Sequence, residues 1–274
     1  MSRRGIFAKS FPGNTAEAVL TAARNAGYGC VQFNLACCGL PPMPDELPPG
    51  TAAAIAAASA RTGAAIAALS GTYNMIHPDP AVRAQGLRRL KVLLSEARAM
   101  GTSLVTLCTG TRDPVDQWRH HPDNDTPSAW ADLLTEMEKA AALAETYGVD
   151  LGIEPEHANV VSTAARAERL LRQVPSPRLA IVLDPANMVE AAGTDQPRLY
   201  AEAADLLAGR IAMAHAKDRD AVGAVVPAGT GIIDFDAFFA ALAQAGFTGP
   251  VVTHGLVAPD AVAGARFLRQ KLAP

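Results

Sequence analysis

The stretch PSAWADLLTEMEKAAALAETYGVDLGIE, residues 127–154, contains one complete helix-to-strand unit. Apolar residues recur at helical spacing up to Tyr147, and Gly148 then supplies the residue type that commonly ends a helix. The run VDLGIE has the length and composition of a buried strand, and it ends on a carboxylate, Glu154. This stretch therefore predicts a helix that leads directly into a strand.

The same unit recurs along the whole chain. Strands are expected at 4–9, 29–34, 64–71, 103–108, 149–154, 179–184, 210–215 and 250–254. Helical spacing lies between them, for example at 15–27, 81–101, 127–148 and 234–246. Glycines stand where several helices should end: Gly27, Gly63, Gly101, Gly148 and Gly246. Eight such units in 274 residues predict an α/β protein, a (β/α)8 TIM barrel. A doubly wound open sheet is the alternative, but no G-x-G-x-x-G follows the first strand.

Composition narrows the function classes. No linker-like shift divides the chain, so residues 1–274 are expected to form a single domain, and the 49% hydrophobic content fits a buried core. The net charge of −3 does not favour binding to nucleic acid or to an anionic membrane. The first residues lack the apolar core of a secretory signal, and Arg61 interrupts the alanine-rich stretch 50–69, so a cytoplasmic location is expected. The four cysteines are expected to be thiols rather than a disulfide framework.

Titratable residues gather where the predicted strands end. Glu154 and Asp184 end two apolar strands, and each precedes a proline that holds it extended. His215 and His254 end the seventh and eighth strands. Barrel enzymes place their chemistry at this end of the strands, so the four side chains are expected to converge on one divalent metal ion. Taken alone, His254 could also be a satisfied core histidine or a general base.

The segments GIEPE, LDPANM, HAKD and GTGIIDFDAFFAALAQAGFTGPVV resemble the sugar phosphate isomerase/epimerase family of the xylose isomerase-like TIM-barrel superfamily. Relatives such as the ketose 3-epimerases bind one divalent ion, often manganese, through Glu, Asp, His and Glu. By position, the resemblance implies Glu154, Asp184 and His215 as ligands here, with His254 in place of the fourth glutamate. Asn187 stands where relatives often place a substrate-binding histidine. Endonuclease IV shares the superfamily, but the charge balance and Asn187 do not favour that activity.

These observations predict a metal-dependent isomerase or epimerase of a small sugar, sugar phosphate or related polyol or keto acid, which works through an enediolate. Glu154 is the expected proton carrier and His254 the second catalytic residue. We also expect His254 to be the fourth ligand, at about 2.0–2.4 Å from the ion. Mn²⁺ or Zn²⁺ is expected first, and Co²⁺ or Mg²⁺ also fits. A metal-dependent hydrolase or lyase remains an alternative, as does a non-catalytic sugar-binding barrel. Homo-oligomerisation stays open.

Polar residues in the loops after the strands are candidates for substrate binding. The loop 109–125 contains a tryptophan, arginines and histidines that could grip a sugar, although a solvated loop explains them equally well. Gly229 and Gly231 lie near the corner where barrels often bind phosphate. The substrate-binding candidates are His77, Arg112, Trp118, Arg119, His121, Asn124, Glu156, Asn187, Lys217 and Arg219.

Overall fold

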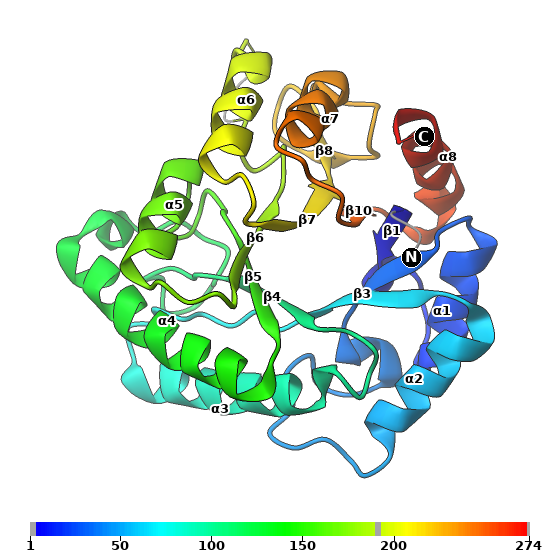
Figure 1. Ribbon diagram of the computed structural model, residues 1–274, viewed down its shortest axis with the longest axis horizontal. Coiled ribbons are helices and arrows are strands. Elements are labelled where there is room, and N and C mark those ends of the chain that lie inside the picture. Colours follow the sequence, from blue (N-terminus) through cyan, green and yellow to red (C-terminus); the bar gives the residue numbers. More distant parts are fainter. Residues whose placement is uncertain (1–3, 190–192, 273–274) are drawn as a thin grey trace.

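Eight parallel strands form a closed barrel, which confirms the predicted fold class. The computed structural model describes residues 4–189 and 193–272. The barrel strands are β1 (Arg4–Phe7), β2 (Cys30–Phe33), β3 (Ala65–Ser70), β4 (Leu104–Cys108), β5 (Asp150–Glu154), β6 (Leu179–Leu183), β7 (Ile211–Ala216) and β10 (Val251–Thr253). Around the barrel they follow the order β1-β10-β7-β6-β5-β4-β3-β2, so each strand pairs with its neighbours in sequence and β1 closes the ring against β10 (Figure 1).

Helices surround the barrel (Figure 1). In the described part of the chain they are α1 (Ala16–Asn25), α2 (Thr51–Thr62), α3 (Pro80–Ala97), α4 (Pro127–Tyr147), α5 (Ala164–Gln173), α6 (Gln196–Leu206), α7 (Phe235–Gln244) and α8 (Ala261–Lys271). Local chemistry sets the ends of α4: the Thr126 hydroxyl accepts the N–H of Ala129 at 3.3 Å, and Gly148 ends the helix with φ of 63°. The other four glycines expected at helix ends also have positive φ.

The side chains inside the barrel form two layers, one apolar and one polar. The apolar layer consists of Ala68, Leu104, Val182, Met213 and Val252. Two positions further along the same five segments stand Ser70, Thr106, Asp184, His215 and His254. Because alternate strand residues share a face, these polar side chains lie on the barrel side, one step nearer its carboxyl end. An apolar floor therefore closes the barrel beneath a polar layer.

Alternation also sends the remaining strand residues outward, where the larger apolar core packs between strands and helices. Thr253 illustrates this on β10. Its hydroxyl donates to the hydroxyl of Tyr28 at 2.9 Å, outside the barrel, while Val252 belongs to the interior floor. Thr253 thus points away from the barrel centre, because adjacent strand residues face opposite sides of the sheet.

Several local features differ from the sequence-based expectation. Ala8–Ser10 forms a 3₁₀ turn rather than the end of the first strand. A small antiparallel pair, β8 (Asp218–Arg219) and β9 (Val225–Val226), follows β7 and was not predicted. Further 3₁₀ turns occupy Leu35–Cys38, Pro122–Asp125 and Ala258–Asp260. The four cysteines are free thiols, as expected. Within residues 4–189 and 193–272, no helix combines the length and apolar character needed to cross a membrane.

Candidate metal centre and active site

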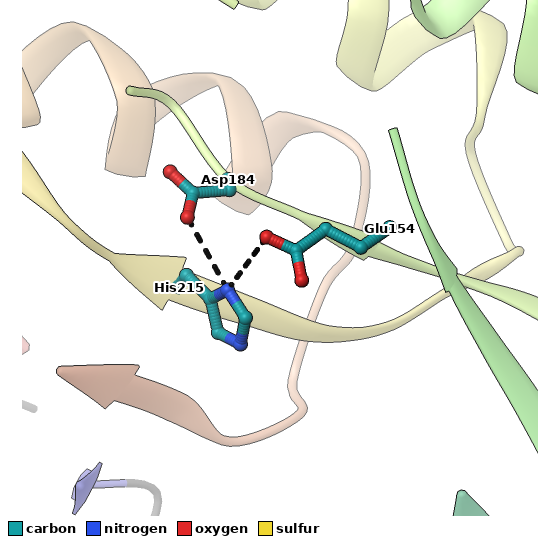
Figure 2. A group of neighbouring side chains, drawn as sticks. All are labelled: Glu154, Asp184 and His215. Carbon is teal, nitrogen blue, oxygen red and sulfur yellow. Dashed lines mark hydrogen bonds and ion pairs between the residues drawn. The ribbon is translucent and has the colours of Figure 1, made fainter. Parts of the chain in front are cut away.

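Glu154, Asp184 and His215 meet at the carboxyl end of the barrel (Figure 2). Glu154 ends β5, Asp184 follows β6 and His215 lies near the end of β7. The Nδ1 atom of His215 lies 3.2 Å from Oε1 of Glu154 and 3.3 Å from Oδ2 of Asp184. The candidate ligand atoms of the three residues all lie within 4.8 Å of one another. Two carboxylates and one imidazole nitrogen, facing a common point, match the ligand types and spacing of a divalent metal site.

Neighbouring groups hold the three side chains in place. The second oxygen of Asp184 accepts the N–H of Ala186 at 2.9 Å, which fixes the carboxylate in the turn made with Pro185. Oε1 of Glu154 accepts the side-chain amide of Asn187 at 3.0 Å. Burial reinforces this order, because His215 is fully buried and Asp184 is 1% exposed. The cluster is therefore held by contacts that do not themselves involve a metal ion.

The electrostatics of the cluster favour a positive charge between the carboxylates. Burial opposes the charged form of His215, but the attraction of Glu154 and Asp184 outweighs it and raises the pKa of His215 to about 10. Burial likewise opposes ionisation of Asp184, yet the charges of Lys217 and His215 lower its pKa. A proton on His215 thus occupies the place that a metal ion would take, so metal binding must displace it.

A cavity of about 480 Å³ opens beside Glu154, the cluster residue that belongs to its lining. Its lining includes Glu154, Glu156, Lys217, His254, Gln32 and Trp118. Burial raises the pKa of Glu156 to about 7, and the charge of Lys217 only partly offsets this. The Lys217 ammonium donates to the side-chain oxygen Oδ1 of Asn187 at 2.9 Å. Burial opposes the charge of Lys217, but the neighbouring carboxylates outweigh it and raise the pKa of Lys217. A small polar molecule in this cavity would meet both charged and neutral hydrogen-bonding groups beside the candidate metal site.

His254 stacks on the cluster instead of joining it. Its ring lies between Phe7, at 4.7 Å between centroids, and His215, at 4.8 Å. Burial and the charge of His215 lower the pKa of His254 to about 4, which keeps the ring neutral. Its Nδ1 is buried and has no hydrogen-bond partner among the described residues. The three-residue cluster does not include His254, so its role as a fourth ligand stays a prediction.

The structure brings some of the substrate-binding candidates to the site. Glu156, Lys217 and Trp118 line the cavity, and Asn187 bridges Glu154 and Lys217 at its edge. Trp118 is 53% exposed, so its indole is open to a ligand.

The other candidates are held in structural contacts and do not line this cavity. In the loop after β4, the guanidinium of Arg112 pairs with Asp132 at 2.6 Å, and that of Arg119 pairs with Asp113 at 2.6 Å. Asn124 is buried and accepts the backbone N–H of Arg112 at 2.7 Å. These contacts order the loop from within, because each polar group has a partner in the loop or in the helix below it.

Backbone groups partner the remaining three candidates. Nδ1 of His77 accepts the N–H of Asp79 at 3.0 Å, and Nδ1 of His121 accepts that of Asp123 at 3.2 Å. Arg219 donates to the carbonyl oxygen of Val189 at 2.7 Å. The structure therefore supports turn and loop roles for these side chains.

The candidate phosphate corner has its backbone donors already paired. The carboxylate of Asp218 accepts the N–H groups of Gly229 and Gly231, both at 2.9 Å, and that of Ile233 at 3.2 Å. Asp218 thereby takes the place that an anion would need at this loop.

Sequence reasoning missed Gln32, which contacts the cluster residue His215 from the opposite side of the barrel. Its Oε1 lies 2.8 Å from Nε2 of His215. Gln32 lies on β2 in an apolar run with no proline or charge beside it. Its position between Val31 and Phe33, which face the outer core, could have shown that Gln32 faces the barrel interior.

Comparison with known proteins supports this architecture. A family model described as "Xylose isomerase-like TIM barrel" matches residues 20–271. L-ribulose-5-phosphate 3-epimerase UlaE from Shigella flexneri serotype 5b is 26% identical over 179 residues, which cover 65% of this chain and 58% of that protein. This chain therefore spans less than two thirds of that relative.

Two solved structures show the same fold at low sequence identity. D-psicose 3-epimerase from Clostridium cellulolyticum H10, solved with D-tagatose, aligns with a TM-score of 0.77 and 19% identity over 99% of both chains. The IOLI protein, solved with a zinc atom, aligns with a TM-score of 0.74 and 17% identity over the whole of both chains.

Proposed function

The chain belongs to the xylose isomerase-like TIM barrel family, and from that premise we propose that it is a divalent-metal-dependent isomerase or epimerase of a small sugar or a related polyol or keto acid. The observation that carries the proposal is the cluster of Glu154, Asp184 and His215, whose Glu154 lines a cavity of about 480 Å³. Sugar epimerases among the similar proteins support the same reaction class.

The three residues fit a divalent ion. Each offers one atom toward a shared point, and the two carboxylates would neutralise most of its charge. Mn²⁺ and Zn²⁺ suit a mixed oxygen and nitrogen site best, and Co²⁺ or Mg²⁺ also fits. When bound, the ion supplies positive charge that stabilises negative charge developing on substrate oxygens.

Glu154 is the proposed proton carrier. Its carboxylate belongs to both the cluster and the cavity wall, so it lies beside any substrate that reaches the cluster. A carboxylate in this position can take a proton from a carbon next to a carbonyl group and return it to the neighbouring atom. Lys217 and Glu156 would orient the substrate hydroxyl and carbonyl oxygens, and Trp118 would cover a sugar face at the cavity mouth.

His254 is proposed as the fourth ligand and as the second catalytic residue. Its support is a buried, unpartnered Nδ1 in a ring that already touches the cluster residue His215. Ligation requires this ring to move, because His254 does not belong to the group whose ligand atoms lie within 4.8 Å of one another. His254→Phe should then weaken zinc binding, whereas unchanged binding would restrict His254 to the cavity wall.

The chain's single ligating glutamate also favours a second candidate, a metal-dependent hydrolase or lyase. Two-base epimerisation needs a second carboxylate at the position that His254 occupies here. Without it, isomerisation with one base or attack by water is favoured over epimerisation. The two candidates differ in what happens to the substrate carbon–hydrogen bond.

One experiment tests both. The protein is stripped with a chelator and reloaded in separate samples with Mn²⁺, Zn²⁺, Co²⁺ or Mg²⁺. Each sample is incubated in deuterium oxide with free and phosphorylated ketoses and aldoses. We expect metal-dependent exchange of a substrate C–H for deuterium, observed by NMR. Cleavage or dehydration without exchange would indicate the hydrolase or lyase, and binding without any turnover would indicate a sugar-binding barrel. Failure to take up any of the four metals would refute the metal-dependent proposal.

A further inference from the structure

We infer that Gln32 is a positioning residue: in the neutral His215 imidazole it keeps the proton on Nε2 and so leaves the lone pair of Nδ1 to the metal ion. This inference rests on the proposed function, since it concerns how the same site holds its metal. It adds a requirement on β2, on the opposite side of the barrel from β5, β6 and β7.

The contact between the two side chains is short and buried. Oε1 of Gln32 lies 2.8 Å from Nε2 of His215, and the two residues are 4% and 0% exposed. A carbonyl oxygen can only accept, so Nε2 must carry the hydrogen in this contact. The lone pair of the neutral ring then belongs to Nδ1, the atom that faces Glu154 and Asp184 at 3.2 and 3.3 Å.

The amide of Gln32 is itself anchored. Its Nε2 donates to the hydroxyl of Thr106 at 3.2 Å and to that of Ser70 at 3.3 Å. Both hydroxyls belong to the polar layer above the barrel floor, and both residues are less than a tenth exposed. In this orientation both hydroxyls accept from the NH₂ end of the amide, and its oxygen faces His215.

The opposite orientation of this amide would have a defined consequence. It would present NH₂ to Nε2 of His215, which would then have to accept and leave the ring proton on Nδ1. In the neutral ring that proton would stay between the carboxylates, where the observed amide orientation places the lone pair of Nδ1. Gln32 therefore decides whether this histidine is a metal ligand, in the way that hydrogen bonds to the second ring nitrogen generally set the ligating tautomer.

Substitution at Gln32 tests the inference with zinc alone as the probe. Gln32→Met keeps the side-chain length and removes the acceptor, and it should weaken zinc binding by about tenfold to a hundredfold. Gln32→Glu has acceptor oxygens in either orientation, so it should bind zinc at least as tightly as the wild type. If Gln32 were only structural, Gln32→Glu should weaken zinc binding at least as much as Gln32→Met, because a new buried carboxylate should disturb the barrel at least as much as methionine does.

A control separates loss of positioning from damage to the barrel. Thr253→Val removes a buried hydroxyl from β10 that bonds outward to Tyr28, so zinc affinity should stay within about twofold of wild type. Equal zinc affinity in the wild type and Gln32→Met would overturn the inference and leave the proposed function intact.

A second readout does not depend on metal. In protein labelled with ¹⁵N-histidine, the Nε2–H of His215 should exchange slowly with deuterium oxide in the wild type and in Gln32→Glu. That protection should be lost in Gln32→Met. If the wild-type chain takes up no zinc, the proposed function fails, and this comparison still decides the inference: equal protection in wild type and Gln32→Met would refute it.

Discussion

Replacing Glu154 by glutamine removes one charge from the cluster and changes little else. Oε1 of Glu154 accepts hydrogen bonds from Asn187 at 3.0 Å and from His215 at 3.2 Å. The carbonyl oxygen of a glutamine in the same rotamer can accept both. The substitution therefore isolates the carboxylate charge beside the buried His215.

The expected cost follows from that geometry. At 3.2 Å, two unit charges attract by about 5 kcal/mol in an effective dielectric of about 20. The net effect is smaller, because the buried carboxylate has lost hydration and is repelled by Asp184. Hydrogen bonds to charged partners contribute about 1 kcal/mol more than neutral ones. We expect Glu154→Gln to lower the unfolding free energy of the metal-free protein by about 1–2 kcal/mol near neutral pH.

The raised pKa of His215 determines how the stability difference between wild type and Glu154→Gln changes with pH. His215 has a pKa raised to about 10, above the value of about 6.5 in an unfolded chain. Its contribution to stability is therefore complete below pH of about 6.5 and is lost as the pH rises through about 10. Glu154→Gln removes part of the cause of the raised pKa. The difference in stability between wild type and variant should be largest near pH of about 6.5 and shrink as the pH rises toward about 10.

The assay is urea unfolding of chelator-treated protein at several pH values. Glu202→Gln is a matched control, since it removes an exposed carboxylate paired with Arg198 and should cost less than about 1 kcal/mol. A difference for Glu154→Gln that grows with pH, or that equals the control, would refute the electrostatic reasoning. In the metal-loaded protein the same variant should slow solvent exchange into substrate by about 10²–10⁴-fold. Undiminished exchange would remove Glu154 from the mechanism.

Three further predictions test the surroundings of the site. Gly86→Ala should destabilise the protein by about 1–3 kcal/mol in thermal unfolding, because the added Cβ would overlap the ring of Tyr73; an unchanged melting temperature would contradict this packing. Asp218→Asn should cost about 1–3 kcal/mol in urea unfolding, since one carboxylate oxygen accepts the N–H groups of Gly229 and Gly231, the other accepts that of Ile233, and the NH₂ group of an amide cannot accept in place of either oxygen. Trp118→Ala should leave stability within about 0.5 kcal/mol. The same variant should raise the KM for a sugar identified in the exchange screen by roughly tenfold, an effect of about 1.4 kcal/mol, and an unchanged KM would exclude a sugar contact.

The fold was predictable because each part of the barrel carries its own local signal. Apolar runs of four to six residues mark the strands, and glycines such as Gly148 mark helix ends with a conformation that other residues rarely adopt. The β8–β9 pair escaped prediction because two-residue strands have no periodicity to detect. The loop candidates Arg112 and Arg119 show a second limit. A sequence reveals a guanidinium but not the carboxylates of Asp132 and Asp113, which pair with it.

The sequence predicted the residues of the candidate site that end apolar strands, but not the residue that lies within a strand. Glu154, Asp184 and His215 were found because titratable groups at the ends of apolar strands need partners, and parallel strands bring those ends together. Gln32 was not predicted because an uncharged amide within a strand does not require a charged partner, and its partner His215 lies 183 residues away in the sequence. Yet position alone could have found it. A polar residue in phase with the barrel interior must bond to another interior group, and the polar layer of Ser70 and Thr106 leaves His215 as the partner for its oxygen. In the role proposed for Gln32, the state of Nδ1 of His215 depends on a residue that only the closed barrel brings near.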